Sequence, residues 1–402
     1  MNISHLNLIQ DVLDRAVQAK KIAGVNLLVC KDDSEAGYWQ SGFADAESGR
    51  AFSRDTICRM YSMTKPVTSV AAMILLEEGR IDLSEELWRY LPEFKNLMIS
   101  DGEGRKSAFR PASRPILIQD LLNMTSGYTY GAWGERCPSG EHLTSDLINR
   151  LNEDVSDANR ITTREFARMI SQIPVSFEPG TSYSYGLSAD ILGAVIETVS
   201  GMKFSEFLKK RIFNPLGMDD TGFYVPAEKQ SRLAKTYTCV EDDSARHLEV
   251  FASPHLGISG EMRNPPAFES GGAGLCSTVS DYMKFARMLT NGGESDGKRI
   301  LHKKTVDFLA TARLRPPLQE AFDRNMEHLS GYTYCNLMRV AVESGRCKAI
   351  TENGEMGWDG WLGPYLSVDR RNSLAIVMTM QMTGAGTTDT TRKVKNIIYS
   401  AL

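Results

Sequence analysis

"RMYSMTKPVTSVAAMILLEEGR", residues 59–80, places Ser62 three positions before Lys65, just ahead of an apolar helical pattern. Apolar residues recur at helical spacing between Val67 and Leu75, and Gly79 follows them as a helix stop. We expect Ser62 at the N-terminus of this helix, where free N–H groups and the helix dipole favour a developing negative charge. Lys65 lies one turn further on the same face, and apolar surroundings would lower its pKa toward that of a usable base. The stretch therefore predicts a serine nucleophile with its own base, and the alternative is a capping serine followed by a solvated lysine.

The same Ser-x-x-Lys spacing occurs twice more, at Ser200 and at Ser295. Ser200 is expected to end one helix before the next begins. Ser295 lies in "GESDG", residues 293–297, which also matches Gly-x-Ser-x-Gly. That motif has meaning only as a sharp turn from a buried strand into a helix, and here a helical pattern precedes it. We therefore predict a surface turn at Ser295 and retain Ser62 as the candidate nucleophile.

The composition excludes several classes of protein. The chain has 402 residues, a net charge of −4 and no run of basic residues, so neither nucleic-acid binding nor attraction to an anionic membrane is expected. No stretch is long and apolar enough to span a bilayer. The seven cysteines form no Cys-x-x-Cys pair and the N-terminus reads as an amphipathic helix, which predicts reduced thiols and a cytoplasmic location. Because the six histidines lack metal-ligand spacing and no phosphate-binding loop occurs, we expect no metal and no cofactor.

Strand-like patterns occur near both ends of the chain, and short helical patterns fill the middle. This order predicts an α/β (α+β) fold in which both termini complete one sheet and a mostly helical subdomain is inserted. We assign residues 1–84 and 300–402 to the sheet domain and 85–299 to the insertion, with the active site between them. The expected strands are 23–30, 35–45, 331–342, 360–369 and 373–381, and a helix is expected over 389–402.

Two further stretches accompany the Ser62 motif. In "EPGTSYSYGLSADILGAVIETVSG", residues 178–201, a turn leads through an aromatic cluster into a helix. In "GEMGWDGWLGPYLSVD", residues 354–369, glycines crowd the approach to a strand, as they do where a backbone must come close to a ligand.

Together these stretches resemble the serine β-lactamase-related hydrolases of the class C β-lactamase and D-alanyl-D-alanine carboxypeptidase type, and most closely their esterase branch. The segments "DLLNMTSGY" (120–128) and "ESGGAGLCSTVSDYMKFARML" (269–289) also resemble family segments. The resemblance covers nearly the whole chain. It implies a β-lactamase/transpeptidase-like fold with an antiparallel sheet.

The resemblance also implies roles for individual residues. Ser62 matches the acylated nucleophile, and Lys65 matches the lysine that takes or relays its proton. Tyr185 matches the tyrosine that bridges the serine and the departing group. The backbone N–H groups of Ser62 and Trp361 would form the oxyanion hole. Which of Lys65 and Tyr185 is the general base stays open.

Two positions depart from the lactamase and peptidase pattern. Leu187 stands where the form Tyr-x-Asn has asparagine, and Trp358 stands where many relatives carry a Lys or His. Trp358 and Gly360, in "WDG", are predicted to contact the substrate. An aromatic loop adds Tyr128 and Trp133 as candidate pocket walls, with ordinary loop packing as the alternative.

The sequence therefore predicts a serine hydrolase that cleaves small to medium, neutral carboxylic esters through an acyl-enzyme on Ser62, with acyl transfer to other acceptors as an additional ability. The alternative is a β-lactamase or a D-amino-acid-specific carboxypeptidase or aminopeptidase. A third reading is a non-catalytic ligand-binding homologue. The expected partner is a small-molecule ester, and an oligomer is compatible with the sequence.

Overall fold

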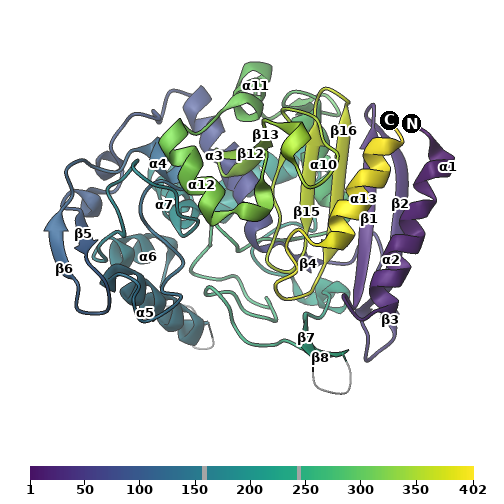
Figure 1. The fold of residues 1–402 in the computed structure, drawn as a ribbon, viewed down its shortest axis with the longest axis horizontal. Coiled ribbons are helices and arrows are strands. Elements are labelled where there is room, and N and C mark those ends of the chain that lie inside the picture. The colour runs from purple at the N-terminus through teal and green to yellow at the C-terminus, as the bar shows by residue number, and fades with distance from the viewer. Residues whose placement is uncertain (156–160, 242–245) are drawn as a thin grey trace.

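An eight-stranded sheet forms the centre of the protein in the computed structural model, which describes residues 1–155, 161–241 and 246–402 (Figure 1). Its strand order is β12-β13-β14-β15-β16-β1-β2-β3, and all neighbouring pairs are antiparallel. The strands are β1 (Gly24–Lys31), β2 (Ser34–Asp45), β3 (Arg50–Ala51), β12 (Tyr332–Cys335), β13 (Met338–Ala341), β14 (Met356–Gly357), β15 (Tyr365–Asp369) and β16 (Leu374–Met380). The predicted sheet, completed by both ends of the chain, is confirmed, but the run 331–342 forms the hairpin β12–β13 rather than the single strand expected.

Helices cover both faces of this sheet. The first face packs against α1 (Ile3–Leu6), α2 (Leu8–Gln18) and α13 (Asp389–Ser400) (Figure 1). The second packs against α10 (Val279–Thr290). Because both faces are covered, β1 and β16 are apolar and buried along almost their whole length. Helix α10 packs on β1, β15 and β16, although the predicted boundary at residue 300 would assign it to the inserted subdomain. The division into two domains stays a prediction.

The middle of the chain is mostly helical, as predicted, but it also contains short hairpins that the sequence patterns did not indicate. The remaining helices are α3 (Thr64–Glu77), α4 (Ile118–Leu122), α5 (Ser139–Asp154), α6 (Thr163–Ile170), α7 (Ser188–Ser200), α8 (Phe204–Leu208), α9 (Asn214–Leu216), α11 (Lys303–Thr311) and α12 (Pro316–Asn325). The hairpins pair β5 (Met98–Asp101) with β6 (Ala108–Pro111), β7 (Tyr237–Glu241) with β8 (Arg246–Val250), and β10 (Glu294–Ser295) with β11 (Lys298–Arg299).

Helix α3 lies inside the protein, and every residue from Thr64 to Leu75 is buried. Its N-terminal half includes the polar residues Lys65, Thr68 and Ser69, whereas the stretch from Val70 to Leu75 is wholly apolar. It packs against α7, and Gly79 follows its C-terminus with φ +66°. Ser200 is the last residue of α7, as predicted. Ser295 is in the tight β10–β11 hairpin, whose turn is exposed, but Ser295 itself is buried. Within the described ranges, no helix has the length and apolar character that crossing a membrane requires.

Candidate active site

Ser62 is the middle residue of a short 3-10 turn, Tyr61–Met63, which leads directly into α3 at Thr64. Strand β4 (Cys58–Arg59) leads into this turn and pairs with β9 (Cys276–Ser277). Tyr61 has φ +45°, a left-handed conformation that costs energy for a residue with a side chain and is often found at functional sites. The turn therefore presents a partly exposed serine from a strained and well-anchored backbone.

Lys65 is completely buried in the first turn of α3. Its Nζ lies 3.2 Å from Ser62 Oγ, 2.8 Å from Tyr130 Oη and 2.9 Å from the carbonyl oxygen of Gly272. Burial lowers the pKa of Lys65 to about 7, and the charges of Asp190 and Asp359 oppose this shift only in part. An uncharged amine is thus accessible near neutral pH, within reach of the serine hydroxyl.

Asp190 fixes the backbone segment around Gly272, whose carbonyl oxygen accepts a hydrogen bond from Lys65. This buried carboxylate accepts hydrogen bonds from Ser270 Oγ at 2.5 Å and from the Gly272 N–H at 3.1 Å. A Cβ on Gly272 would lie 2.6 Å from Asp190 Oδ2, so only glycine fits there without a shift. Neither Asp190 nor Gly272 was singled out in the sequence, because no local pattern marks their meeting with Lys65.

Tyr185 lies just before α7, with its ring 4.6 Å from Lys65 Nζ. The Trp358 Nε1–H donates to Tyr185 Oη at 2.8 Å. Desolvation raises the pKa of Tyr185, and the neighbouring Ser62 and Trp358 side chains lower it only in part. The phenol is therefore protonated at neutral pH and can donate or relay a proton.

The structure adds Tyr130 to the site, a residue that the sequence analysis missed. It comes from the predicted aromatic loop, but Tyr128, two residues earlier, is 1% exposed and packs edge-on against Phe94. Tyr128 is thus corrected from a candidate pocket wall to a core residue, and Tyr130 is the tyrosine of this loop that reaches Lys65. Trp133 is 91% exposed, and its contact with a substrate stays a prediction. The two tyrosines were indistinguishable in "SGYTY" because the pattern does not fix which way each side chain points.

The turn that carries Trp358 lies directly against the backbone before Ser62. A Cβ on Gly360 would come within 2.4 Å of the Met60 carbonyl oxygen, which shows how closely the two segments approach. The Trp361 ring packs edge-on against Tyr61 at 5.1 Å and stacks on His255 at 4.0 Å. Among the described residues, the backbone N–H groups of Ser62 and Trp361 have no hydrogen-bond acceptor. Trp358 itself is only 4% exposed, so its indole supports Tyr185 from inside the protein.

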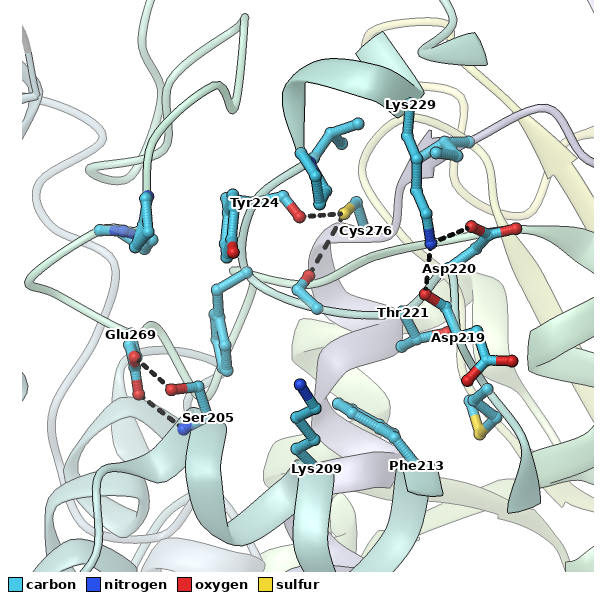
Figure 2. A pocket seen from close by; sticks show the side chains of 18 of the residues that line it. Ser205, Lys209, Phe213, Asp219, Asp220, Thr221, Tyr224, Lys229, Glu269 and Cys276 are labelled. Carbon is cyan, nitrogen blue, oxygen red and sulfur yellow. Dashed lines mark hydrogen bonds and ion pairs between the residues drawn. The ribbon is translucent and has the colours of Figure 1, made fainter. Parts of the chain in front are cut away.

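A pocket of about 370 Å³ lies elsewhere, beside a π-helical turn that follows α8 (Figure 2). Lys209, Phe213 and Tyr224 line it, and the buried Glu269 carboxylate in its wall is held by Ser205 (Figure 2). None of the side chains around Ser62 lines this pocket. It is therefore separate from the candidate active site.

Comparison with known proteins gives a consistent result. The sequence model of the family described as Beta-lactamase matches residues 9–397. Esterase EstB of Burkholderia gladioli is 30% identical, over 68% of this chain and 67% of its own length. Lovastatin esterase of Penicillium rubens is 28% identical, over 91% of this chain and 90% of its own length. The solved structure of EstCE1, described as a hydrolase with promiscuous acyltransferase activity, superposes with a TM-score of 0.79 at 21% identity and covers 99% of both chains.

Proposed function

This chain belongs to the beta-lactamase family, and we propose that it is a serine hydrolase that cleaves carboxylic esters through an acyl-enzyme on Ser62. One observation carries the proposal: a fully buried lysine with a pKa near 7 lies 3.2 Å from the hydroxyl of a partly exposed serine. A solvated lysine behind a capping serine would be exposed and would keep its ordinary pKa. The relatives named as esterases support the same reaction.

In the proposed acylation step, neutral Lys65 accepts the Ser62 proton as Oγ attacks the ester carbonyl. Lys65 is assigned as the base because burial raises the pKa of both Tyr130 and Tyr185, whereas it lowers that of the lysine. The Gly272 carbonyl and Tyr130 Oη then hold the lysinium that forms. Tyr185 donates its proton to the leaving alcohol and regains one from Lys65.

The tetrahedral oxyanion needs donors aimed at it. We assign this role to the backbone N–H groups of Ser62 and Trp361, which have no acceptor in the described part of the chain. The close packing of Gly360 on Met60 supports their convergence. Water then attacks the acyl-enzyme by the reverse route, and an alcohol in its place gives acyl transfer.

The substrate is proposed to be a small to medium, neutral ester. Leu187, where a lactamase-type site has asparagine, is 3% exposed and packs in the core, so this position offers no amide to a peptide or β-lactam. Trp358 and Gly360 are proposed to border the ester group, and Trp133 to line the approach. A cytoplasmic location belongs to the same proposal and is supported by the free thiols of all seven cysteines.

The test compares initial rates on p-nitrophenyl butyrate and on a chromogenic cephalosporin. Wild type should cleave the ester far faster, and Ser62→Ala should lose this activity completely. Ser295→Ala, in another Ser-x-x-Lys motif, is the matched control and should keep full activity. Mass spectrometry of quenched reactions should find the butyryl group on the peptide that contains Ser62. Preferential cephalosporin cleavage would assign the protein to the lactamase alternative, and full activity in Ser62→Ala would overturn the mechanism.

A further inference from the structure

A small pocket of about 20 Å³ lies between strand β13 and helix α13, on the face of the sheet away from α10. Four permanently charged side chains line it, namely Arg339, Lys348, Arg392 and Lys395, and no Asp or Glu does. Such an arrangement of cations without a lining anion is unfavourable unless a negative charge completes it.

Two of these cations form the floor of the pocket. Arg339 and Lys395 are each 2% exposed, and one carboxylate, Glu355, pairs with both, at 3.2 Å and 3.1 Å. Desolvation raises the pKa of Glu355, but the two cations outweigh it and lower this pKa to about 2. Glu355 is therefore ionised. Among the described residues it is the only carboxylate that forms an ion pair with either cation, so these three side chains together carry one net positive charge. The Asp359 carboxylate also acts on Arg339, from beyond ion-pair distance.

The guanidinium of Arg339 has unused donors. Its Nη2 donates to Glu355 and to the Leu366 carbonyl oxygen, but Nε and Nη1 have no acceptor in the described part of the chain. The rings of Tyr332 and Tyr365 flank the guanidinium at 5.7 Å and 4.6 Å. These rings offset part of its charge but accept no directional hydrogen bond from its edge. The free edge is thus available to an anion in the pocket.

The rim connects the pocket to the turn that carries Trp358. Arg392 donates to the carbonyl oxygen of Thr387, and the Thr387 hydroxyl donates to the Asp359 carboxylate at 2.5 Å. Thr387 lines the pocket, and Asp359 follows Trp358 directly. Neither Lys348 nor Arg392 forms an ion pair with any described residue, so both rim charges are available to an occupant.

We propose that this pocket is a binding site for one small monovalent anion of about the size of a halide ion. Its volume of about 20 Å³ has room for roughly one water-sized species, which excludes a bulky anion. The anion neutralises the excess charge of Arg339 and Lys395 and accepts from the free edge of Arg339. Through Arg392 and Thr387 it also steadies the turn around Asp359. Binding of a free anion does not depend on the esterase proposal.

The first experiment measures thermal unfolding of the full chain in sodium bromide and in sodium gluconate at equal ionic strength. Bromide should raise Tm in a saturable manner, and gluconate, which is too large, should not. The rise should be lost in Arg392→Gln and in Lys348→Gln, which remove rim charges without opening the core. Lys298→Gln, an equal charge change in the distant β10–β11 hairpin, should keep it. An equal Tm in bromide and gluconate would overturn the proposal and would show that the pocket holds water instead of an anion. An undiminished bromide effect in Arg392→Gln and Lys348→Gln would overturn it as well.

Crystals soaked in bromide locate the site directly. An anomalous peak beside Arg339 is expected, whereas bromide peaks only at other places would contradict the assignment.

Discussion

The side-chain nitrogen of Lys65 lies 2.8 Å from the phenol oxygen of Tyr130, closer than it lies to Ser62 Oγ, at 3.2 Å. The lysine is thus held by a second tyrosine in addition to Tyr185, whose ring lies over the ammonium at 4.6 Å. With Tyr130 and Tyr185 on either side, the Lys65 nitrogen keeps its position next to Ser62 Oγ whether the amine is neutral or protonated.

Tyr130→Phe should lower kcat/KM for a neutral ester about tenfold to a hundredfold, because a hydrogen bond to a charged group contributes about 1.5–3 kcal/mol. Tyr128→Phe is the matched control: its hydroxyl is buried and has no hydrogen-bond partner among the described residues, so removing it should leave the rate unchanged. Steady-state kinetics of both variants decide the point. Equal losses in the two would show that Tyr130 acts only through packing.

The pH dependence of kcat/KM should report the pKa of Lys65. Because burial lowers this pKa to about 7 and the neutral amine is the reactive form, activity should rise between about pH 6 and pH 8 and then level off. The charge of Asp359 raises the pKa of Lys65, so Asp359→Asn should move the rising limb to lower pH. A limb near pH 10, the range of an exposed lysine, would contradict the assignment.

Gly360→Ala should lower kcat by about a hundredfold to a thousandfold, the usual cost of losing an oxyanion donor. The added Cβ would meet the Met60 carbonyl oxygen at 2.4 Å and push the Trp361 N–H away from Ser62. Gly345→Ala, whose Cβ would have no neighbour within 4 Å, is the control. Circular dichroism and Tm should show both variants folded. Full activity in Gly360→Ala would remove Trp361 from the proposed oxyanion hole.

Trp358→Phe should reduce kcat about twofold to tenfold and change KM less, because it removes one hydrogen bond to Tyr185 and keeps most of the packing. The half-buried Trp88, which lies near Arg89 and Lys95 at the surface, provides the control Trp88→Phe. If Trp358→Phe instead raised KM and left kcat unchanged, Trp358 would act only as a substrate contact.

The features that the sequence predicted are those encoded locally. The apolar pattern after Ser62 predicted helix α3 and placed Lys65 in it beside Ser62. The strand patterns at both ends of the chain predicted the central sheet. The sequence patterns did not predict the hairpins of the middle region, because their strands are short and partly exposed and show no clear alternation of buried and exposed residues. At the site, Asp190 and Gly272 escaped because their role is created only where α7 meets the 269–277 segment beside α3.

The contact between Lys65 and the Gly272 carbonyl spans 207 residues of chain. During synthesis the serine and its lysine are therefore made long before the backbone that receives the lysine exists. Until that backbone closes over it, Lys65 is solvated, carries its ordinary charge and cannot activate Ser62. Activity is consequently expected only after the segment around Gly272 has packed against the start of α3.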